Sequence, residues 1–448
     1  MQQHHQQKLL ILGARQMQLP AFQAARELGL FVIAIDPSPH AVGLTLADCS
    51  YNYDLADEAA ILTVAKQHSI DGILTLAADY PVPMVAKVSQ QLNIPGLSKT
   101  AAMVSTNKAQ MRKVLQTKGI TIPQWRETRT LNQALEAVRN FQGGVIVKPA
   151  DSSGGRGVTL IESDTTDETI SKAFYKALNF SQQGKVMVEE FIAGKEISVE
   201  AITIKGKTEI VRITDKLTTE APFFVEIGHS QPSQLSAKEK EQVTQLTLAG
   251  IAALEIDNTA SHTEIRFSGD LAKRASKADR LAPQRSRDRP YIIEIGARLG
   301  GGYITSHLVP LSCGVDLVKA TLQLAIGETP NLQPTKDCGS AIRFLRPDPG
   351  QVIDIQGVAA AQKVAEITEV VVEVTPGKLI KPLRDATARV GYVISKGKNA
   401  IAAIQNAETA KNLIQINTWK NQEVRKMKNV INREKSTTSN QPLTTNQL

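Results

Sequence analysis

The residues with the clearest chemical potential lie in the segment YIIEIGARLGGG, residues 291–302. An apolar run brings Glu294 to the end of an expected strand, Arg298 follows four residues later, and three glycines come next. A second carboxylate, Glu264, lies in another strand-like stretch, HTEIRF. Two carboxylates on neighbouring strands are ligands that Mg²⁺ with a nucleotide triphosphate requires. The segment therefore predicts a phosphate and metal site, and a buried Glu–Arg ion pair beside a glycine-rich turn is the alternative.

Two lysines and a glycine-rich loop extend this chemistry. Lys108 lies on an expected helix, Lys148 ends an expected strand, and residues 152–157 (SSGGRG) precede a further strand at 158–161. Strand, loop and strand form a hairpin flap, unlike a P-loop, and GxxxxGK[ST] is absent. The backbone N–H groups of such a flap can fold over phosphates. A solvated helix face is the alternative for the lysine-bearing helix.

A third stretch has the pattern of a strand that opens into a linker. It is VMVEEFIAG, residues 186–194, and an alternating half-buried strand follows at 196–201. Unpaired linker N–H and C=O groups can pair with a purine edge. The Glu196 carboxylate can accept hydrogen bonds from both hydroxyls of a ribose.

These groups need a scaffold, and the first hundred residues indicate its type. Apolar strands alternate with helices, with strands expected at 8–12, 31–35 and 72–76 and helices at 20–28, 57–67 and 83–92. This order predicts a parallel α/β layer that closes near Ser98. The first turn reads GARQMQ and not GxGxxG, which argues against NAD binding.

Composition sets the outer limits. A chain of 448 residues, 42% hydrophobic, is too long for one ordinary core and predicts two to four domains. No apolar run approaches the roughly 20 residues of a membrane span, and the N-terminus lacks the apolar segment of a secretory signal. We expect a soluble, cytoplasmic protein. The three cysteines, Cys49, Cys313 and Cys338, show no metal-ligand spacing and are expected to be buried thiols.

The net charge of +8 is concentrated in two stretches. Residues 268–290 hold seven Lys/Arg against three acids, and residues 420–435 hold six against two. Neither stretch interleaves aromatic residues with its basic ones, so a nucleic-acid surface is not indicated. We expect a solvated insertion at 270–289 that loops outward and is disordered or mobile, and a frayed basic tail.

Taken together and in this order, the motifs resemble the ATP-grasp superfamily over nearly the whole chain. They are Lys108, Lys148, the SSGGRG loop, VEEFIAG-x-E, HTE and EIGARLGGG. The segment from Glu226 to His229 with Pro232 before a helix, then HTE, is similar to the L-amino-acid and dipeptide ligases. The late segment from residues 349–351 through 390–394 also resembles the C-terminal domain of those ligases.

The resemblance implies a role for each motif residue. Lys108 and Lys148 would hold ATP phosphates, and Glu264 and Glu294 would bind the metal. Arg298 would face the acyl phosphate as a catalytic residue beside Lys148. The other implied nucleotide-binding residues are Ser152, Ser153, Gly154, Gly155 and Gly157 in the flap, Glu189, Glu190 and Ile192 around the adenine, and Glu196 on the ribose.

Two positions leave alternatives open. His262 could position a substrate or take the proton of the amine, and so could His229, but a structural histidine fits each equally well. Much of the superfamily has Asn where this chain has Gly296, so water or a substrate oxygen must complete one Mg²⁺ shell.

The implied fold is α/β with the ATP-grasp architecture. It consists of a Rossmann-like N-terminal layer, a small lid with a glycine-rich flap, a mixed central sheet and a C-terminal α+β domain. The expected boundaries are 1–98, 99–335 with the lid at about 122–192 and a basic insertion at about 269–290, 336–418, and a tail at 419–448.

The implied activity is an ATP-dependent carboxylate–amine ligase that forms an amide or peptide bond through an acyl phosphate and releases ADP and phosphate. Its cofactors would be ATP and one or two Mg²⁺ ions, with Mn²⁺ as a substitute. Its partners would be small carboxylates and amines, amino acids in the first place, with no nucleic acid and no membrane; a homodimer stays open. The alternatives are a purine-biosynthesis or biotin-carboxylase-like ATP-grasp enzyme, and an ATP-binding protein without turnover.

Overall fold

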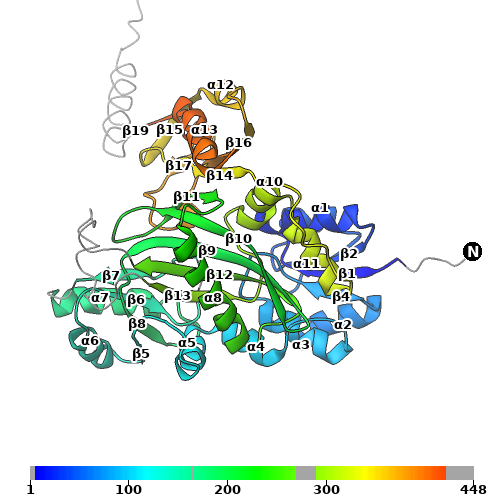
Figure 1. Ribbon diagram of the computed structural model, residues 1–448, viewed down its shortest axis with the longest axis horizontal. Helices are drawn as coiled ribbons and strands as arrows, with labels where there is room; N and C mark the ends of the chain where they lie inside the picture. The colour runs from blue at the N-terminus through cyan, green and yellow to red at the C-terminus, as the bar shows by residue number, and fades with distance from the viewer. Residues whose placement is uncertain (1–5, 153, 163–164, 269–288, 420–448) are drawn as a thin grey trace, which may run out of the picture.

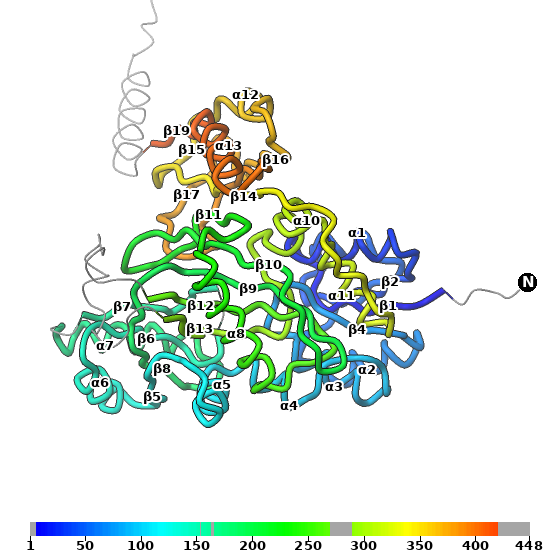
Figure 2. The backbone as a smooth tube through the Cα atoms, viewed as in Figure 1, coloured from blue at the N-terminus to red at the C-terminus, as the bar shows by residue number. Residues whose placement is uncertain are grey.

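The computed structural model describes residues 6–152, 154–162, 165–268 and 289–419 (Figure 1). Residues 269–288 of the expected basic insertion, almost all of the C-terminal tail and Ser153 lie outside these ranges. The backbone tube shows a broad lower body with a smaller C-terminal part standing above it (Figure 2). Within the described chain no single helix has the length and apolarity to cross a membrane. One pair bent by 115°, Ile304–Cys313 with Leu317–Ala325, reaches the necessary length and composition only together.

The N-terminal layer is the parallel α/β unit that the sequence predicts. Its strand order is β3-β2-β1-β4, formed by β1 (Lys8–Leu12), β2 (Phe31–Ile35), β3 (Cys49–Tyr51) and β4 (Gly72–Leu74). Side chains alternate across β1, so Leu9 and Ile11 pack on one face and Leu10 and Leu12 on the other. Four helices cover the two faces: α1 (Leu19–Glu27) and α11 (Leu317–Ala325) on the first, α2 (Glu58–His68) and α3 (Val82–Leu92) on the second.

The lid is a four-stranded antiparallel sheet of order β5-β8-β6-β7. It consists of β5 (Trp125–Thr128), β6 (Val145–Pro149), β7 (Thr159–Ile161) and β8 (Val186–Glu190), backed by α6 (Leu131–Asn140) and α7 (Asp167–Leu178). Thr130 and Gln133 form a capping box that starts α6. The hairpin β6–β7 carries the glycine-rich flap, as predicted.

The central sheet supplies most of the charged residues discussed below. Its order is β13-β12-β9-β10-β11-β14-β18-β16. The first five strands are β9 (Gly194–Ile204), β10 (Lys207–Thr218), β11 (Glu226–Gln231), β12 (Thr259–Ser268) and β13 (Pro290–Gly296). Helices α4 (Lys99–Thr106), α5 (Lys108–Thr117) and α8 (Ala237–Ala253) pack beside it. The expectation of a mixed central sheet is corrected, because all its pairings in the described chain are antiparallel; neighbouring strands such as β9 and β10 are joined by short turns that reverse the chain.

The C-terminal region continues this sheet through β14 (Gly339–Phe344), β16 (Ile367–Val372) and β18 (Gly391–Gly397). A three-stranded sheet, β17-β15-β19, lies beside them and is formed by β15 (Gly350–Gln356), β17 (Leu379–Ile380) and β19 (Gln415–Trp419). Helix α13 (Ala400–Leu413) packs its alanines on β14, and α12 (Val358–Gln362) lies at the outer end (Figure 1). The short helices η4 (Ile304–Leu308) and α10 (Val309–Cys313) connect the glycine-rich turn to α11. The domain boundaries stay predictions.

Candidate active site

A cavity of about 240 Å³ lies where the flap, the central sheet and the C-terminal region meet. Its wall includes flap residues Ser152, Gly154 and Gly155, Glu264 from the middle of β12, Glu294 near the end of β13, and residues of the segment 384–389. Most of the predicted site residues are therefore gathered around one cavity.

The two predicted metal carboxylates lie directly opposite each other. Glu264 on β12 pairs with Glu294 on β13, so both side chains leave the same face of the antiparallel pair. Each makes an ion pair through Oε1: Glu264 with Nζ of Lys216 at 3.0 Å and Glu294 with Nζ of Lys108 at 2.6 Å. Burial would raise the pKa of Glu264, but Lys216 and His262 outweigh it and hold the pKa well below its usual range.

The donor set fits Mg²⁺, which prefers oxygen ligands and carries waters and phosphate oxygens in its remaining positions. Two carboxylates face one cavity, and the described chain offers no group of three or more His, Cys, Asp or Glu side chains able to hold a metal ion. The rest of a Mg²⁺ shell would therefore come from phosphates and water.

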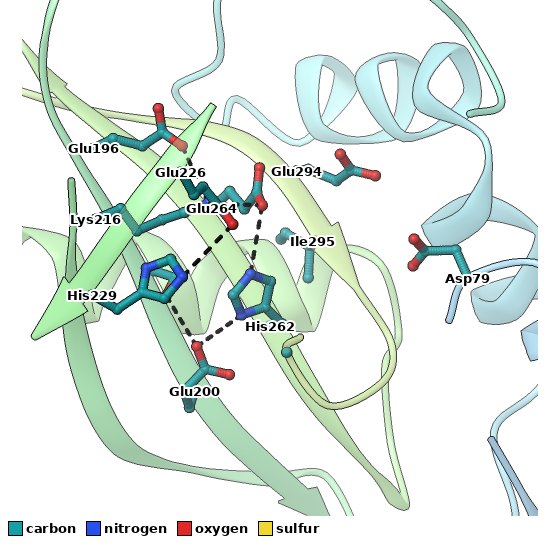
Figure 3. Close-up of polar contacts among 12 residues, drawn as sticks. Asp79, Glu196, Glu200, Lys216, Glu226, His229, His262, Glu264, Glu294 and Ile295 are labelled. Carbon is teal, nitrogen blue, oxygen red and sulfur yellow. Dashed lines mark hydrogen bonds and ion pairs between the residues drawn. The ribbon is translucent and has the colours of Figure 1, made fainter. Parts of the chain in front are cut away.

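Lys216 on β10 is a site residue that the sequence did not reveal. Its side chain is 1% exposed, and its ammonium lies 3.1 Å from Glu196, 2.7 Å from Glu226 and 3.0 Å from Glu264. Figure 3 shows the lysine at the centre of these carboxylates. Burial would lower the pKa of Lys216, but the three carboxylates raise it well above its ordinary value, so the side chain stays charged.

A buried ion-pair network lies under the lid. Glu189 accepts from Nε and Nη2 of Arg112 at 3.0 and 3.1 Å, and its Oε2 lies 2.7 Å from Nζ of Lys148. Burial would raise the pKa of Glu189, but Arg112 and Lys148 lower it to about 2. The helix at 108–117 is thus no solvated face, because Lys108 and Arg112 are both buried.

The flap is tied to this network through Lys108. Its ammonium donates to the carbonyl of Ser152 at 3.0 Å while it pairs with Glu294. Gly154 and Gly155 have positive φ angles of +70° and +73° and open space around them, as a loop over a ligand requires. Gly157 has a different role. A Cβ at this position would lie 3.1 Å from Phe180 and Pro149, so glycine is needed here because these side chains pack closely against the backbone.

The residues expected around the adenine and ribose lie along the end of β8 and the start of β9. The N–H of Glu190 donates to the carbonyl of Gln124 at 2.8 Å. A backbone hydrogen bond from adenine to Glu190 would therefore have to use the carbonyl group of Glu190 as the acceptor. Arg266 reaches the Ile192 carbonyl at 3.4 Å and Glu196 at 2.6 Å. Glu196 is therefore held from two sides, by Arg266 and by Lys216.

Arg298 is anchored to the N-terminal layer. Its Nε and Nη2 donate to both carboxylate oxygens of Asp79, at 2.8 and 3.0 Å. Burial would lower the pKa of Arg298, but Asp79 raises it above its ordinary value. A Cβ on Gly296 would lie 3.1 Å from Cζ of Arg298, so the guanidinium occupies the space that a side chain at position 296 would need.

His262 lies behind Glu264 and is not part of the cavity wall. Its Nδ1 is 2.7 Å from Glu200 and its Nε2 is 3.6 Å from Glu264. Burial would lower the pKa of His262, but Glu200 outweighs it and raises the pKa to about 9, so the imidazole is protonated at neutral pH. His229 is also buried; burial lowers its pKa to about 3, which leaves it neutral.

The glycine-rich turn packs on these histidines. A Cβ on Gly300 would lie 2.5 Å from Nδ1 of His262, and one on Gly302 would lie 2.8 Å from Nε2 of His229. The glycines therefore let the backbone approach a buried polar cluster, where the sequence suggested an approach to phosphate.

Two family models match parts of the chain. Residues 141–282 match the ATP-grasp domain, and residues 343–418 match the L-amino acid ligase C-terminal domain 2. Among curated relatives, the uncharacterized protein y4rH of Sinorhizobium fredii is 26% identical over 339 residues. That match covers 74% of this chain and 65% of the relative, so the chain spans slightly less than two thirds of it.

Solved structures agree on the fold. An L-amino acid ligase from Bacillus licheniformis superposes with a TM-score of 0.77 at 22% identity, covering 92% of this chain and 99% of that one. A phosphoribosylglycinamide synthetase from Anaerococcus prevotii gives a TM-score of 0.70 at 23% identity, covering 93% and 100%. The chain thus contains a region, residues 141–282, that matches the ATP-grasp domain, and a C-terminal region, residues 343–418, that matches the C-terminal domain 2 of the L-amino acid ligases, and it shares the fold of the two solved enzymes.

Proposed function

We propose that the protein is an ATP-dependent carboxylate–amine ligase that forms an amide or peptide bond through an acyl phosphate. The observation that carries this proposal is the convergence of Lys108, the Glu264–Glu294 pair and Arg298 on one cavity beneath a glycine-rich flap. The match of residues 343–418 to an L-amino acid ligase domain favours amino acids as substrates.

The carboxylate pair would hold the metal. Mg²⁺, when bound by Glu264 and Glu294, would neutralise the oxygens of the transferring phosphoryl group. The backbone of the flap and the side chains of Lys108 and Lys148 would contact the ATP phosphates. Phosphoryl transfer needs little beyond positioning and charge compensation, and this cavity offers both.

Arg298 would face the reacting carboxyl group. Asp79 holds two of its nitrogens, so the guanidinium keeps one orientation and its positive charge. A fixed cation at this place can stabilise the tetrahedral oxyanion that forms when the amine attacks the acyl phosphate. The flap would exclude water, which otherwise hydrolyses the mixed anhydride.

His262 would act through Glu264. Because Glu200 holds the imidazole protonated and Glu264 lies on its other side, the ring fixes the position of a metal carboxylate from behind. The attacking α-amine has an ordinary pKa near 8 and is partly neutral at cellular pH, so it needs placement more than a strong base.

One observation supports a second class of enzyme as an alternative. The phosphoribosylglycinamide synthetase of Anaerococcus prevotii shares the fold over nearly its whole length, so a purine-biosynthesis type of ATP-grasp ligase remains the rival. Its carboxylate and amine would differ, whereas its nucleotide products would be the same.

The test is a screen of amino-acid pairs with ATP and Mg²⁺. The proposal predicts ADP and phosphate, together with a product whose mass is one water below the summed substrates. AMP as the main nucleotide would overturn the acyl-phosphate route. ADP formed only with bicarbonate, formate or a phosphoribosyl amine would transfer the protein to the rival class. Light scattering of the same preparation would show whether the chain forms a homodimer.

A further inference from the structure

The ammonium of Lys216 contacts three carboxylates from three different strands. Glu196 belongs to β9, Glu226 to β11 and Glu264 to β12, and each contributes its Oε1 at 3.1 Å or less. In the strand register Lys216 lies opposite Glu196 on one side and His229 on the other. Figure 3 shows all three side chains turned toward the lysine.

Lys216 is the cation that these carboxylates share. Glu196 has a second partner in Arg266 at 2.6 Å, and Glu226 has one in Arg389 at 3.1 Å. Each arginine, Arg266 on β12 and Arg389 before β18, reaches one of these carboxylates, whereas Lys216 contacts all three with 1% of its side chain exposed. Its amine is therefore surrounded by oxygen ligands of the kind a hard divalent cation selects.

We propose that Lys216 competes with divalent cations for the Glu226 and Glu264 carboxylates, so that the chain binds a free divalent cation weakly and binds it well only together with a nucleotide polyphosphate. This inference rests on the proposed metal site at Glu264. A fixed ammonium within about 3 Å of a ligand oxygen repels a second cation strongly where solvent screening is small. The phosphates of a nucleotide in the same cavity add negative charge, which compensates both the lysine and the metal.

The inference predicts the order in which metal and nucleotide bind. A chain with Lys216 in place would not collect free Mg²⁺, and its metal would arrive as the nucleotide complex. A lysine with only a structural role gives a different expectation: its removal would leave three carboxylates repelling one another and would lower stability without any gain in metal affinity.

The experiment measures Mn²⁺ binding without nucleotide, by the electron paramagnetic resonance signal of free Mn²⁺, for the full chain and three variants. Lys216→Met removes the charge and should bind Mn²⁺ at least tenfold more tightly than the unmodified chain. Lys216→Arg keeps the charge and should bind as weakly as the unmodified chain. Lys195→Met removes a lysine that pairs with Glu239 at 3.8 Å outside the cavity and should change nothing.

Lys216→Gln is the second test variant, since its amide can still hydrogen-bond the carboxylates if the methionine variant does not fold, and circular dichroism checks both. Unchanged Mn²⁺ affinity in the folded neutral variants overturns the inference. Retention of the Mn²⁺–ADP complex, measured on the unmodified chain by equilibrium dialysis, tests the proposed function separately. A chain that retains no Mn²⁺–ADP contradicts the proposed function, whatever the variants show.

Discussion

At the scale of single residues, the site is a set of charges that hold one another in place. Glu294 pairs with Lys108, Glu264 with Lys216, Glu189 with Arg112 and Lys148, and Arg298 with Asp79. Burial would raise the pKa values of Glu264, Glu189 and Asp79, but a cation within about 3 Å of each carboxylate holds its pKa below the usual range. Pre-placed charges of this kind need no rearrangement when phosphoryl charge develops.

The carboxylate pair gives the first prediction. Glu264→Gln or Glu294→Gln should lower kcat by about 10²-fold or more, because each removes a charge that faces the transferring phosphoryl group. Steady-state ADP release with Mg²⁺ and a productive amino-acid pair is the measurement. Glu241→Gln, a change on the exposed side of α8, is the matched control and should leave kcat unchanged. Turnover close to that of the unmodified chain in both site variants would contradict the assignment of Glu264 and Glu294 as metal ligands.

The buried arginine gives the second. Arg112→Met should lower the free energy of unfolding by about 3 kcal/mol, because Glu189 and the Ile293 carbonyl lose buried donors. Lys113→Met on the exposed side of the same helix should change it by less than about 0.5 kcal/mol. Urea unfolding of both variants makes the comparison, and equal losses would show that the buried pair contributes no special stability.

The pKa of Glu189 gives the third. Its value is lowered from 4.5 to about 2 in the folded chain, so the stability it contributes is complete above pH 4.5 and is lost as the pH falls toward 2. Glu189→Gln should therefore cost more at pH 6 than at pH 3. Urea unfolding at both pH values measures the difference, and a cost that is independent of pH would contradict the depressed pKa.

At the scale of elements, the predictions from sequence succeeded where a pattern is local. Strands β1, β2 and β4 of the N-terminal layer, the β6–β7 hairpin, and the placement of Glu264 and Glu294 in two strands follow from apolar runs and turn residues, whereas the short strand β3 was not predicted. Helix α11 could not be assigned to the N-terminal layer in this way, because its packing partners lie about 300 residues earlier in the chain.

Missed site residues have the same explanation. Lys216 stands in RITDKLTT, a strand with no motif, and its role depends on the order β12-β9-β10-β11. Asp79 comes after the three-residue strand β4, and only its contact with Arg298 in the folded chain identifies it as a site residue. Arg112 lies on the helix for which a solvated face was the alternative, although its side chain is completely buried against Glu189 and the Ile293 carbonyl. Pairing order and burial are properties of the fold, and no local spacing encodes them.

The flap gives the prediction at this scale. Gly154→Ala and Gly157→Ala both place a side chain at positive φ, at a cost of about 1 kcal/mol. Only Gly157→Ala also meets Phe180 and Pro149, so it should reduce the hydrogen-exchange protection of β6 and β7 more than Gly154→Ala does. Gly154→Ala, which faces the cavity, should instead raise the KM for ATP. If Gly154→Ala and Gly157→Ala had the same effect on hydrogen-exchange protection and on the KM for ATP, the two glycines would not have separate roles in ligand binding and packing.

At the scale of the whole molecule, the cavity is assembled from parts far apart in sequence. The N-terminal layer contributes Asp79, the lid contributes the flap, the central sheet contributes the carboxylates, and the C-terminal region contributes Arg389, whose guanidinium donates to the Glu226 carbonyl and lies over the Phe344 ring. The proposed reaction would thus depend on how the parts dock, as well as on the residues in the cavity.

The contact between Asp79 and Arg298 tests this dependence. Asp79→Asn should lower kcat between about 10- and 100-fold, because the guanidinium loses its bidentate anchor and its orientation. The KM for ATP should change much less than kcat, since the hydrogen bonds described for the Asp79 carboxylate go to Arg298 and not to the flap. Asp54→Asn in the same layer lies outside the cavity and serves as the control. A rise in the KM for ATP with kcat preserved would place Asp79 in nucleotide binding instead.

The central claim, an acyl phosphate formed from the substrate carboxylate, is tested most directly by an oxygen label. An amino acid carrying ¹⁸O in its carboxylate, a productive amine partner, ATP and Mg²⁺ are incubated with the protein, and the phosphate and nucleotides are analysed by mass spectrometry. The account predicts one ¹⁸O atom in each phosphate released and none in the nucleotide. Label in AMP, or amide product formed without label in phosphate, would contradict it.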